Sequence, residues 1–436
     1  MKQAKQIKNS YNGYLLLLML FSPIMGVVQL LRNRDEKTLL LFGIVFFGLA
    51  GSVYVYRPGS DGEAHLSNAI LNYSDMSFNM FLNQFYDLIT LNGSHTGTKD
   101  IYLHCLSFLA TSIFGVPELI HVFAGLILGY FFTKSILLVL KNNIDTEKSA
   151  VLVAFILLFI FFRSLGALNS IRMWTGMWVF FYGTYSYAIT KKKKFLAVIF
   201  FSIIVHFSYV IILIPFLVSY ILRNRTFVMT GLFFASFGMS LNFANIENLL
   251  PKTELVENQQ SANVIASDED AERFAERYEN QGKVAQNFYV KYGEAFFKSY
   301  CVIGLSLLLL FFYNHKKADK KFIFLMASGL GLMSFSNMVT FSPSLSGRVS
   351  TIATVYILAA AIQFLLTIKN YGLNVKKTSL VHRLLVIFLI SSIPMVLFQM
   401  SYLIQMLSFF TLVLPPVSWF LGNADFSIRE GISQLF

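Results

Sequence analysis

The sequence contains few charged residues. Only 13% of its 436 residues are Asp, Glu, Lys or Arg, whereas a soluble globular protein has about 25%. Apolar residues make up 56%, and several runs approach or exceed the roughly 18 apolar residues of a membrane-spanning helix. These features exclude an ordinary soluble fold and predict an all-α polytopic integral membrane protein.

Cysteine and catalytic motifs are scarce as well. The two cysteines, Cys105 and Cys301, lie far apart in sequence, which excludes a disulfide framework. The chain lacks a nucleotide-binding glycine loop, HExxH and GxSxG, so it does not resemble an ATP-driven pump or a soluble-type hydrolase. His, Cys and carboxylate residues never occur with zinc-site spacing, so we expect no metal and no cofactor.

The basic excess has a membrane explanation. A formal charge of +12 would suggest nucleic acid in a soluble protein, but most Lys and Arg here lie in short loops between apolar runs. The positive-inside rule therefore places these loops in the cytoplasm, and no nucleic-acid partner is expected. The loops predicted to be cytoplasmic are 32–37, 141–148, 191–194, 223–225, 315–321 and 369–377.

Between these loops we expect about 12 or 13 membrane spans in one transmembrane domain covering residues 1–436. The predicted spans lie near 14–32, 38–56, 117–140, 149–163, 171–190, 195–207, 209–222, 226–244, 298–313, 321–339, 349–368 and 380–398, with an interfacial stretch at 402–421. The predicted external loops are 57–100, 163–170 and 245–298. Residues 101–115 are expected to form an amphipathic helix on the outer face.

The apolar run 195–222 has basic residues on both sides, so one crossing would put one basic flank outside. Two crossings would have about 14 residues each, roughly 21 Å, which is short of a ~30 Å membrane core. The prediction is a pair of short helices meeting near "VHFSY", with His206 at the tip. The alternative is one long tilted helix with a buried histidine.

Two arginines stand where outward helix ends are expected. Arg172 opens the span 171–190, with Asn169 or Ser170 as cap, and Arg348 follows the small residues Ser346 and Gly347. A helix N-terminus offers free N–H groups and positive potential, and arginine grips phosphate with two hydrogen bonds. The pair therefore predicts a diphosphate site, with arginines snorkelling to the interface as the alternative.

The first external loop adds further charges. Arg57 and Asp61 lie just beyond the second predicted span, and Glu63 and His65 are expected to be ordinary residues of a solvated loop. His206 is a different case, because an ionisable group inside an apolar segment is functional by default.

These motifs resemble a known family. The pattern is R-x-x-x-D (Arg57 to Asp61), then N-x-x-R (Asn169 to Arg172) heading a helix that ends in lysines, then H-x-S from His206, and later Arg348. It resembles the EpsG-like and Wzy-type polysaccharide polymerases of bacterial envelopes over residues 14–370. The most specific part is "NSIRMWTG" followed by "TKKKKFLAVIFFSIIVHFS", whereas "DGEAHLS" lacks the tyrosine that often follows the aspartate.

The resemblance implies a GT-C-like glycosyltransferase, in which positive groups bind the departing diphosphate and a base takes the acceptor proton. Arg172 and Arg348, with Arg57, would bind the diphosphate. His206 would be the base, with Asp61 as the second choice. Asn169 and Ser346 would support the site.

The same resemblance implies the cellular setting. The enzyme would join undecaprenyl-diphosphate-linked oligosaccharide repeat units at the outer face of the bacterial inner (plasma) membrane. Its partners would be that substrate, membrane lipid and a chain-length regulator protein. The alternatives are an oligosaccharide-lipid ligase or another GT-C glycosyltransferase, and a lipid-linked sugar transporter.

Overall fold

The computed structural model describes residues 13–15, 17–22, 35–92, 98, 100–140, 149–241, 288–313, 319–371, 374–411, 415–416 and 426–435. Regular structure within these ranges is helical, and β pairing there is limited to isolated bridges. Five helices are long and apolar enough to cross a membrane: Leu119–Leu140, Ala150–Leu168, Glu294–Phe312, Pro343–Thr367 and Val375–Met406. The chain is an all-α, multi-pass membrane protein.

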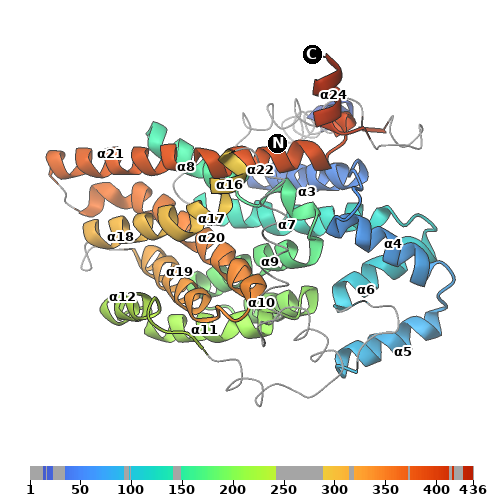
Figure 1. Ribbon diagram of the computed structural model, residues 1–436, viewed down its shortest axis with the longest axis horizontal. Coiled ribbons are helices and arrows are strands. Elements are labelled where there is room, and N and C mark those ends of the chain that lie inside the picture. The colour runs from blue at the N-terminus through green and yellow to red at the C-terminus, as the bar shows by residue number, and fades with distance from the viewer. Residues whose placement is uncertain are drawn as a thin grey trace, which may run out of the picture.

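The helices follow one another through the chain as Figure 1 shows. The first half contains α3 Glu36–Ser52, α4 Asp61–Tyr73, α5 Phe78–Ile89, α6 Ile101–Ser107, α7 Leu119–Leu140, α8 Ala150–Phe161, α9 Ile171–Thr190, α10 Lys194–Val205, α11 Tyr209–Leu222 and α12 Thr226–Ala235. The second half contains α16 Phe288–Tyr292, α17 Glu294–Phe296, α18 Val302–Phe312, α19 Lys320–Met338, α20 Pro343–Thr367, α21 Val375–Ser391, α22 Ile393–Met406 and α24 Ile428–Leu435. Short π-helical turns η1 Phe108–Ile113 and η3 Phe297–Cys301 and 3-10 turns η2 Leu165–Leu168, η4 Ile368–Tyr371 and η5 Phe409–Thr411 complete the set.

Helices α3 and α7 pack antiparallel at very close range. A Cβ added to Gly51 would lie 2.1 Å from the carbonyl oxygen of His121, and one added to Gly125 would lie 2.3 Å from the carbonyl oxygen of Phe47. Only glycine fits at these two contacts. Small residues that let two backbones approach are the usual basis of helix packing in membranes, where apolar burial contributes little.

The segment 195–222 forms the predicted pair of short helices, and the single-helix alternative is wrong. α10 ends at Val205, His206 has extended backbone (φ −155°, ψ 120°), and α11 starts at Tyr209. At that tip Tyr209 Oη donates to the carbonyl oxygen of Met173, 2.9 Å away. At the other end Lys191 Nζ donates to Tyr220 Oη at 2.6 Å, so the two basic flanks lie together.

The helix ends predicted to face outward also lie together. At this end Val55 N donates to the carbonyl oxygen of Met406, Ser336 Oγ donates to that of Ser346, and Arg163 pairs with Glu294. The contacts join the end of α3 to that of α22, the end of α19 to the start of α20, and the end of α8 to the start of α17. We call this the outer end, and α4, α5 and α6 lie there, at the right of Figure 1.

Several predicted segments need correction. The helix predicted at 101–115 is present as α6 and its continuation η1, and α6 lies at the outer end, but it is packed inside the protein, where Tyr102, Leu103 and His104 are buried. α5 instead exposes an apolar stripe that includes Phe78 and Tyr86. The segment 57–100, predicted to be an external loop, contains two helices, α4 and α5.

The C-terminal spans also differ from the prediction. The predicted span 380–398 is longer in the structure, where α21 and α22 reach Met406 with a break at Ser392. The stretch predicted to be interfacial, 402–421, begins inside α22, and its residues 412–414 and 417–421 lie outside the described residues. Of the predicted loop 245–298, only residues from 288 onward are described.

The two basic flanks of the hairpin give a topology test. A single cysteine at exposed Asn224, in a chain with Cys105 and Cys301 replaced by serine, should resist an impermeant maleimide on intact cells because that flank is predicted to be cytoplasmic. It should react in inverted vesicles. Asp75→Cys, at the outer end, is the matched control and should react on intact cells. Labelling of the Asn224 site from outside would contradict the hairpin orientation.

Candidate functional site

Four of the predicted site residues meet at one cavity. Asp61, Arg172, His206 and Arg348 line a hollow of about 60 Å³ at the outer end. Its other walls are His65, Ser170, Met173 and Trp174. We call this the outer cavity. It is polar and large enough for a few water molecules, so charged groups in it can stay hydrated.

Arg172 is the second residue of α9, so the predicted helix start is confirmed. The first backbone N–H groups of a helix have no partner inside that helix, so positive potential converges here. One guanidinium nitrogen, Nη1, donates to Oδ2 of Asp100 at 2.7 Å, and the Arg172 side chain is 26% exposed. Arginine has five N–H donors, which leaves several for a ligand.

The two candidate caps of α9 do something other than cap it. Ser170 is the N-cap residue but makes no side-chain cap bond, because its hydroxyl donates to the carboxylate of Asp61. Asn169 Oδ1 accepts from Tyr54 Oη at 2.8 Å and from the backbone N of Gly62 at 3.2 Å. Asn169 does not line the outer cavity. It ties the start of α4, and hence Asp61, to the start of α9.

Arg348 reaches the cavity from a different helical position than predicted. α20 begins at Pro343, so Arg348 stands in the second turn, and the prediction that it opens the helix is wrong. Ser342 is the N-cap residue, and its side chain accepts a hydrogen bond from Leu345 N. Pro343 suits the first position of the helix because the N–H that proline lacks would have no partner inside the helix there. Ser346 bonds to Ser336 across the α19–α20 contact and does not line the cavity.

Arg348 is the cation of the cavity with the fewest partners. Within the described part of the chain it makes no ion pair or hydrogen bond, although the charges of Arg172, Asp61 and Asp100 all act on it. Two guanidinium groups therefore face one small space, which favours an anion between them.

Asp100 is a residue that the sequence argument missed. Its side chain is 1% exposed, and its two oxygens accept from Arg172, from Nδ1 of His206 at 3.1 and 3.2 Å, and from the backbone N of Phe207 at 2.9 Å. Burial alone would raise the pKa of Asp100, but His206, Arg172 and the Phe207 N–H hold that pKa well below its usual range. Asp100 is therefore an anion.

The sequence around Asp100 indicates a helix cap and not a site residue. An aspartate directly before an apolar helix is ordinarily an N-cap, and Asp100 does occupy the N-cap position of α6. Its carboxylate makes no cap bond there, because it turns to residues from α9 and from the α10–α11 tip. These partners are 72 and 107 positions away in the chain, so local pattern could not reveal them.

His65 corrects a second expectation. It is 8% exposed on α4 and lines the outer cavity, so it is not part of a solvated loop. Burial and the charge of Arg172 lower the pKa of His65 to about 3, against the opposing effect of Asp100. The imidazole is thus neutral near pH 7. Arg57 lies apart from the cavity and donates from Nη1 to Oε1 of Gln405 at 2.8 Å.

A buried ion network contacts two of the segments that line the cavity. Glu294 Oε1 accepts from Arg163 Nη2 at 2.5 Å and from Lys298 Nζ at 2.9 Å. Lys298 Nζ also donates to the carbonyl oxygen of Gly347, the neighbour of Arg348, at 3.2 Å. The Arg163 guanidinium lies 4.4 Å from the ring centre of Trp174, a cavity wall. The network fixes two walls of the cavity.

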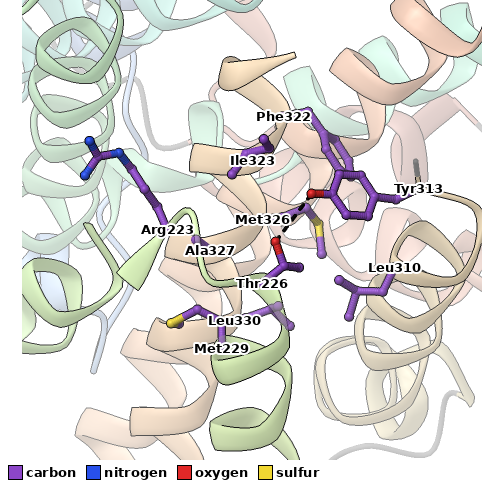
Figure 2. A pocket seen from close by; sticks show the side chains of 10 residues that line it. All are labelled: Arg223, Thr226, Met229, Leu310, Tyr313, Phe322, Ile323, Met326, Ala327 and Leu330. Carbon is purple, nitrogen blue, oxygen red and sulfur yellow. Dashed lines mark hydrogen bonds between the residues drawn. The ribbon is translucent and has the colours of Figure 1, made fainter. Parts of the chain in front are cut away.

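Other places in the described chain offer less chemistry. No group of three His, Cys, Asp or Glu side chains among the described residues could hold a metal ion. A second cavity of about 10 Å³ lies at the opposite end (Figure 2), mostly walled by apolar side chains, with Thr226 near Tyr313. It is about the size of one water molecule, too small for a substrate.

Comparison with known proteins adds no identification: no protein-family model, curated protein or solved structure matches the chain. The candidate site therefore stands on its own geometry.

Glu294 should be important for stability. Glu294→Ala would leave Arg163 and Lys298, only 12% and 13% exposed, facing each other without an anion. We expect a loss of about 3 kcal/mol in the free energy of unfolding. Thermal unfolding in detergent would measure the effect. Glu118→Ala, which removes an exposed carboxylate, is the control, and an equal melting temperature for both variants would contradict the network's role.

Proposed function

We propose that the protein is a polysaccharide polymerase that transfers undecaprenyl-diphosphate-linked oligosaccharide repeat units onto one another. The observation that carries the proposal is the meeting of Arg172, Arg348, His206 and Asp61 around the outer cavity. These residues come from four separate parts of the chain. Cations for a diphosphate and bases for a hydroxyl are the two sets of groups that this reaction needs.

The reaction can be written for these groups. The acceptor sugar hydroxyl attacks the anomeric carbon of the donor, a new carbon–oxygen bond forms, and the bond to the diphosphate oxygen breaks. The diphosphate leaves with its negative charge, which Arg172 and Arg348 stabilise together with the N–H groups of the α9 start. The hydroxyl proton passes to His206 in its neutral form. Arg172 and Arg348 thus supply the positive charge for the leaving group, and His206 supplies the acceptor for the proton, so the proposed reaction needs no cofactor and no metal.

The second-choice base and the remaining predicted residues have lesser roles in the proposal. Asp61 is exposed and shares a hydrogen bond with Ser170, so it is suited to bind acceptor hydroxyls. Arg57, engaged with Gln405, would act outside the reacting centre. Asn169 and Ser346 would serve by holding helices in place.

The proposal includes the cellular setting. The protein would have a GT-C-like architecture of 12 or 13 membrane segments, including the short pair α10 and α11. It would lie in the bacterial inner membrane with its site toward the periplasm or exterior. Its partners would be the lipid-linked oligosaccharide, membrane lipid and a chain-length regulator protein.

The alternatives differ in what happens to the donor. An oligosaccharide-lipid ligase or another GT-C glycosyltransferase would use the same bond changes with a different acceptor. A transporter would leave the donor chemically unchanged. Incubation of purified protein with a short-chain lipid-diphosphate repeat unit separates these cases. A ladder of longer products is expected, and an unchanged donor would overturn the proposal.

Substitution of the arginines tests the site. Arg172→Lys should lose about 100-fold or more of the polymerising rate, nearly as much as Arg172→Ala, because lysine cannot form the two-bonded grip on phosphate. An Arg172–Arg348 double alanine variant should lose less than the product of the single losses, since both grip one group. Initial rates with the same lipid-linked donor would measure this.

Two controls accompany this test: membrane insertion of every variant, and a substitution of an arginine far from the outer cavity. All variants should insert and purify like the parent protein. Arg225→Lys, at the opposite end of α9–α11, should keep full activity. A fully active Arg172→Lys enzyme would show that Arg172 acts as an anchor at the membrane interface, because lysine snorkels as well as arginine.

A further inference from the structure

The geometry points to a role for Asp100 that goes beyond the residues assigned above. We propose that Asp100 is a positioning residue that holds His206 with its Nε2 bare toward the outer cavity and holds Arg172 in register with it. The inference rests on the proposed function. The observation behind it is one buried carboxylate shared by the candidate base and a candidate diphosphate ligand.

The tautomer follows from the contacts of the ring. Both oxygens of the ionised Asp100 lie within 3.2 Å of His206 Nδ1, and a carboxylate only accepts hydrogen bonds. Nδ1 must therefore carry the proton, which leaves the lone pair on Nε2 in the neutral ring. Nε2 makes no hydrogen bond to the described residues, so it can take a proton from a ligand. When it does, the adjacent carboxylate stabilises the imidazolium.

The same carboxylate is held firmly itself. It accepts from Phe207 N on Oδ1 and from Arg172 Nη1 on Oδ2, so each oxygen has a donor besides the imidazole. Phe207 belongs to the α10–α11 tip and Arg172 to the start of α9. Asp100 thus sets the distance between the group that would take the proton and the group that would hold the diphosphate.

Asp100→Asn separates this role from simple bridging. The substitution removes the Oδ2 acceptor of Arg172 Nη1. The side-chain amide keeps one accepting oxygen, which faces the Phe207 N–H, and puts an NH₂ group where Oδ2 lay 3.2 Å from His206 Nδ1. That NH₂ can only donate, so it favours a bare Nδ1 and a proton on Nε2. The variant would keep the size and a hydrogen bond of Asp100, but His206 would present the wrong nitrogen to the acceptor hydroxyl.

The first measurement needs no activity. Nitrogen-15 NMR of histidine-labelled protein at about pH 8, where an ordinary imidazole is neutral, distinguishes the two tautomers. His206→Gln identifies the signal of His206 by its disappearance. We expect the Nδ1–H tautomer in the parent protein and the Nε2–H tautomer in Asp100→Asn. A parent His206 that carries its proton on Nε2 overturns the inference, whether or not any variant folds.

The second measurement is kinetic, with the lipid-linked donor and a fixed acceptor. Asp100→Asn should lower kcat at least about 100-fold with KM for the donor changed less than about threefold. Asp100→Glu, which restores a carboxylate, should recover a tenth or more of the parent rate. Asp75→Asn, an exposed aspartate, is the control. Asn and Glu variants of equal activity would contradict a role through the tautomer.

The two arms separate two kinds of failure. If the parent protein makes no longer products, the proposed function fails, and the NMR result still decides whether Asp100 sets the tautomer. If the parent polymerises and Asp100→Asn keeps both its rate and the Nδ1–H tautomer, the function stands and the inference about Asp100 is wrong.

Discussion

A carboxylate taken almost completely out of water controls the arrangement of the outer end. Burying one ion costs several kcal/mol unless partners surround it, so Asp100 is stable only while Arg172, His206 and the Phe207 N–H converge on it. Those partners begin α9 and form the tip between α10 and α11. The requirement to satisfy one anion therefore fixes how two helical units meet, and the outer cavity forms where they meet.

The depth of the cavity follows from the length of the hairpin. α10 and α11 contain 12 and 14 residues, so they are about 18 and 21 Å long, which is less than a ~30 Å membrane core. The tip with His206 consequently ends below the outer surface when both basic flanks lie at the inner one. Broken helices persist at such depth where the backbone is buried in protein or lines a wet cavity. Here His206 has extended backbone between the two helices and lines the outer cavity.

Charge around the cavity is close to balance before any ligand binds. Arg172 and Arg348 face Asp61 and Asp100, while His65 is neutral because burial disfavours its charged form. An arriving anion therefore meets one arginine already anchored and one without a partner among the described residues. Anchoring costs Arg172 one donor and keeps it in place, which is the condition under which a positive group stabilises a developing charge best.

The sequence by itself determined the class of protein and the helix pair. Few charges, long apolar runs and basic loops require a helical membrane protein, because an unpaired backbone cannot lie in lipid. The basic flanks of 195–222 favoured the hairpin over one long tilted helix, and Arg172 was recognisable because it opens an uncharged helix.

Only the tertiary structure decided which residues share the cavity. Asp100 carries the local signal of a helix cap, and His65 that of a solvated loop, yet both are buried against Arg172 or His206. The small residues before Arg348 led to the prediction that it opens its helix, whereas it lies in the second turn of α20. Such partners are chosen by the packing of helices distant in the chain, and hydrophobic period and capping patterns report only on residues a few positions apart.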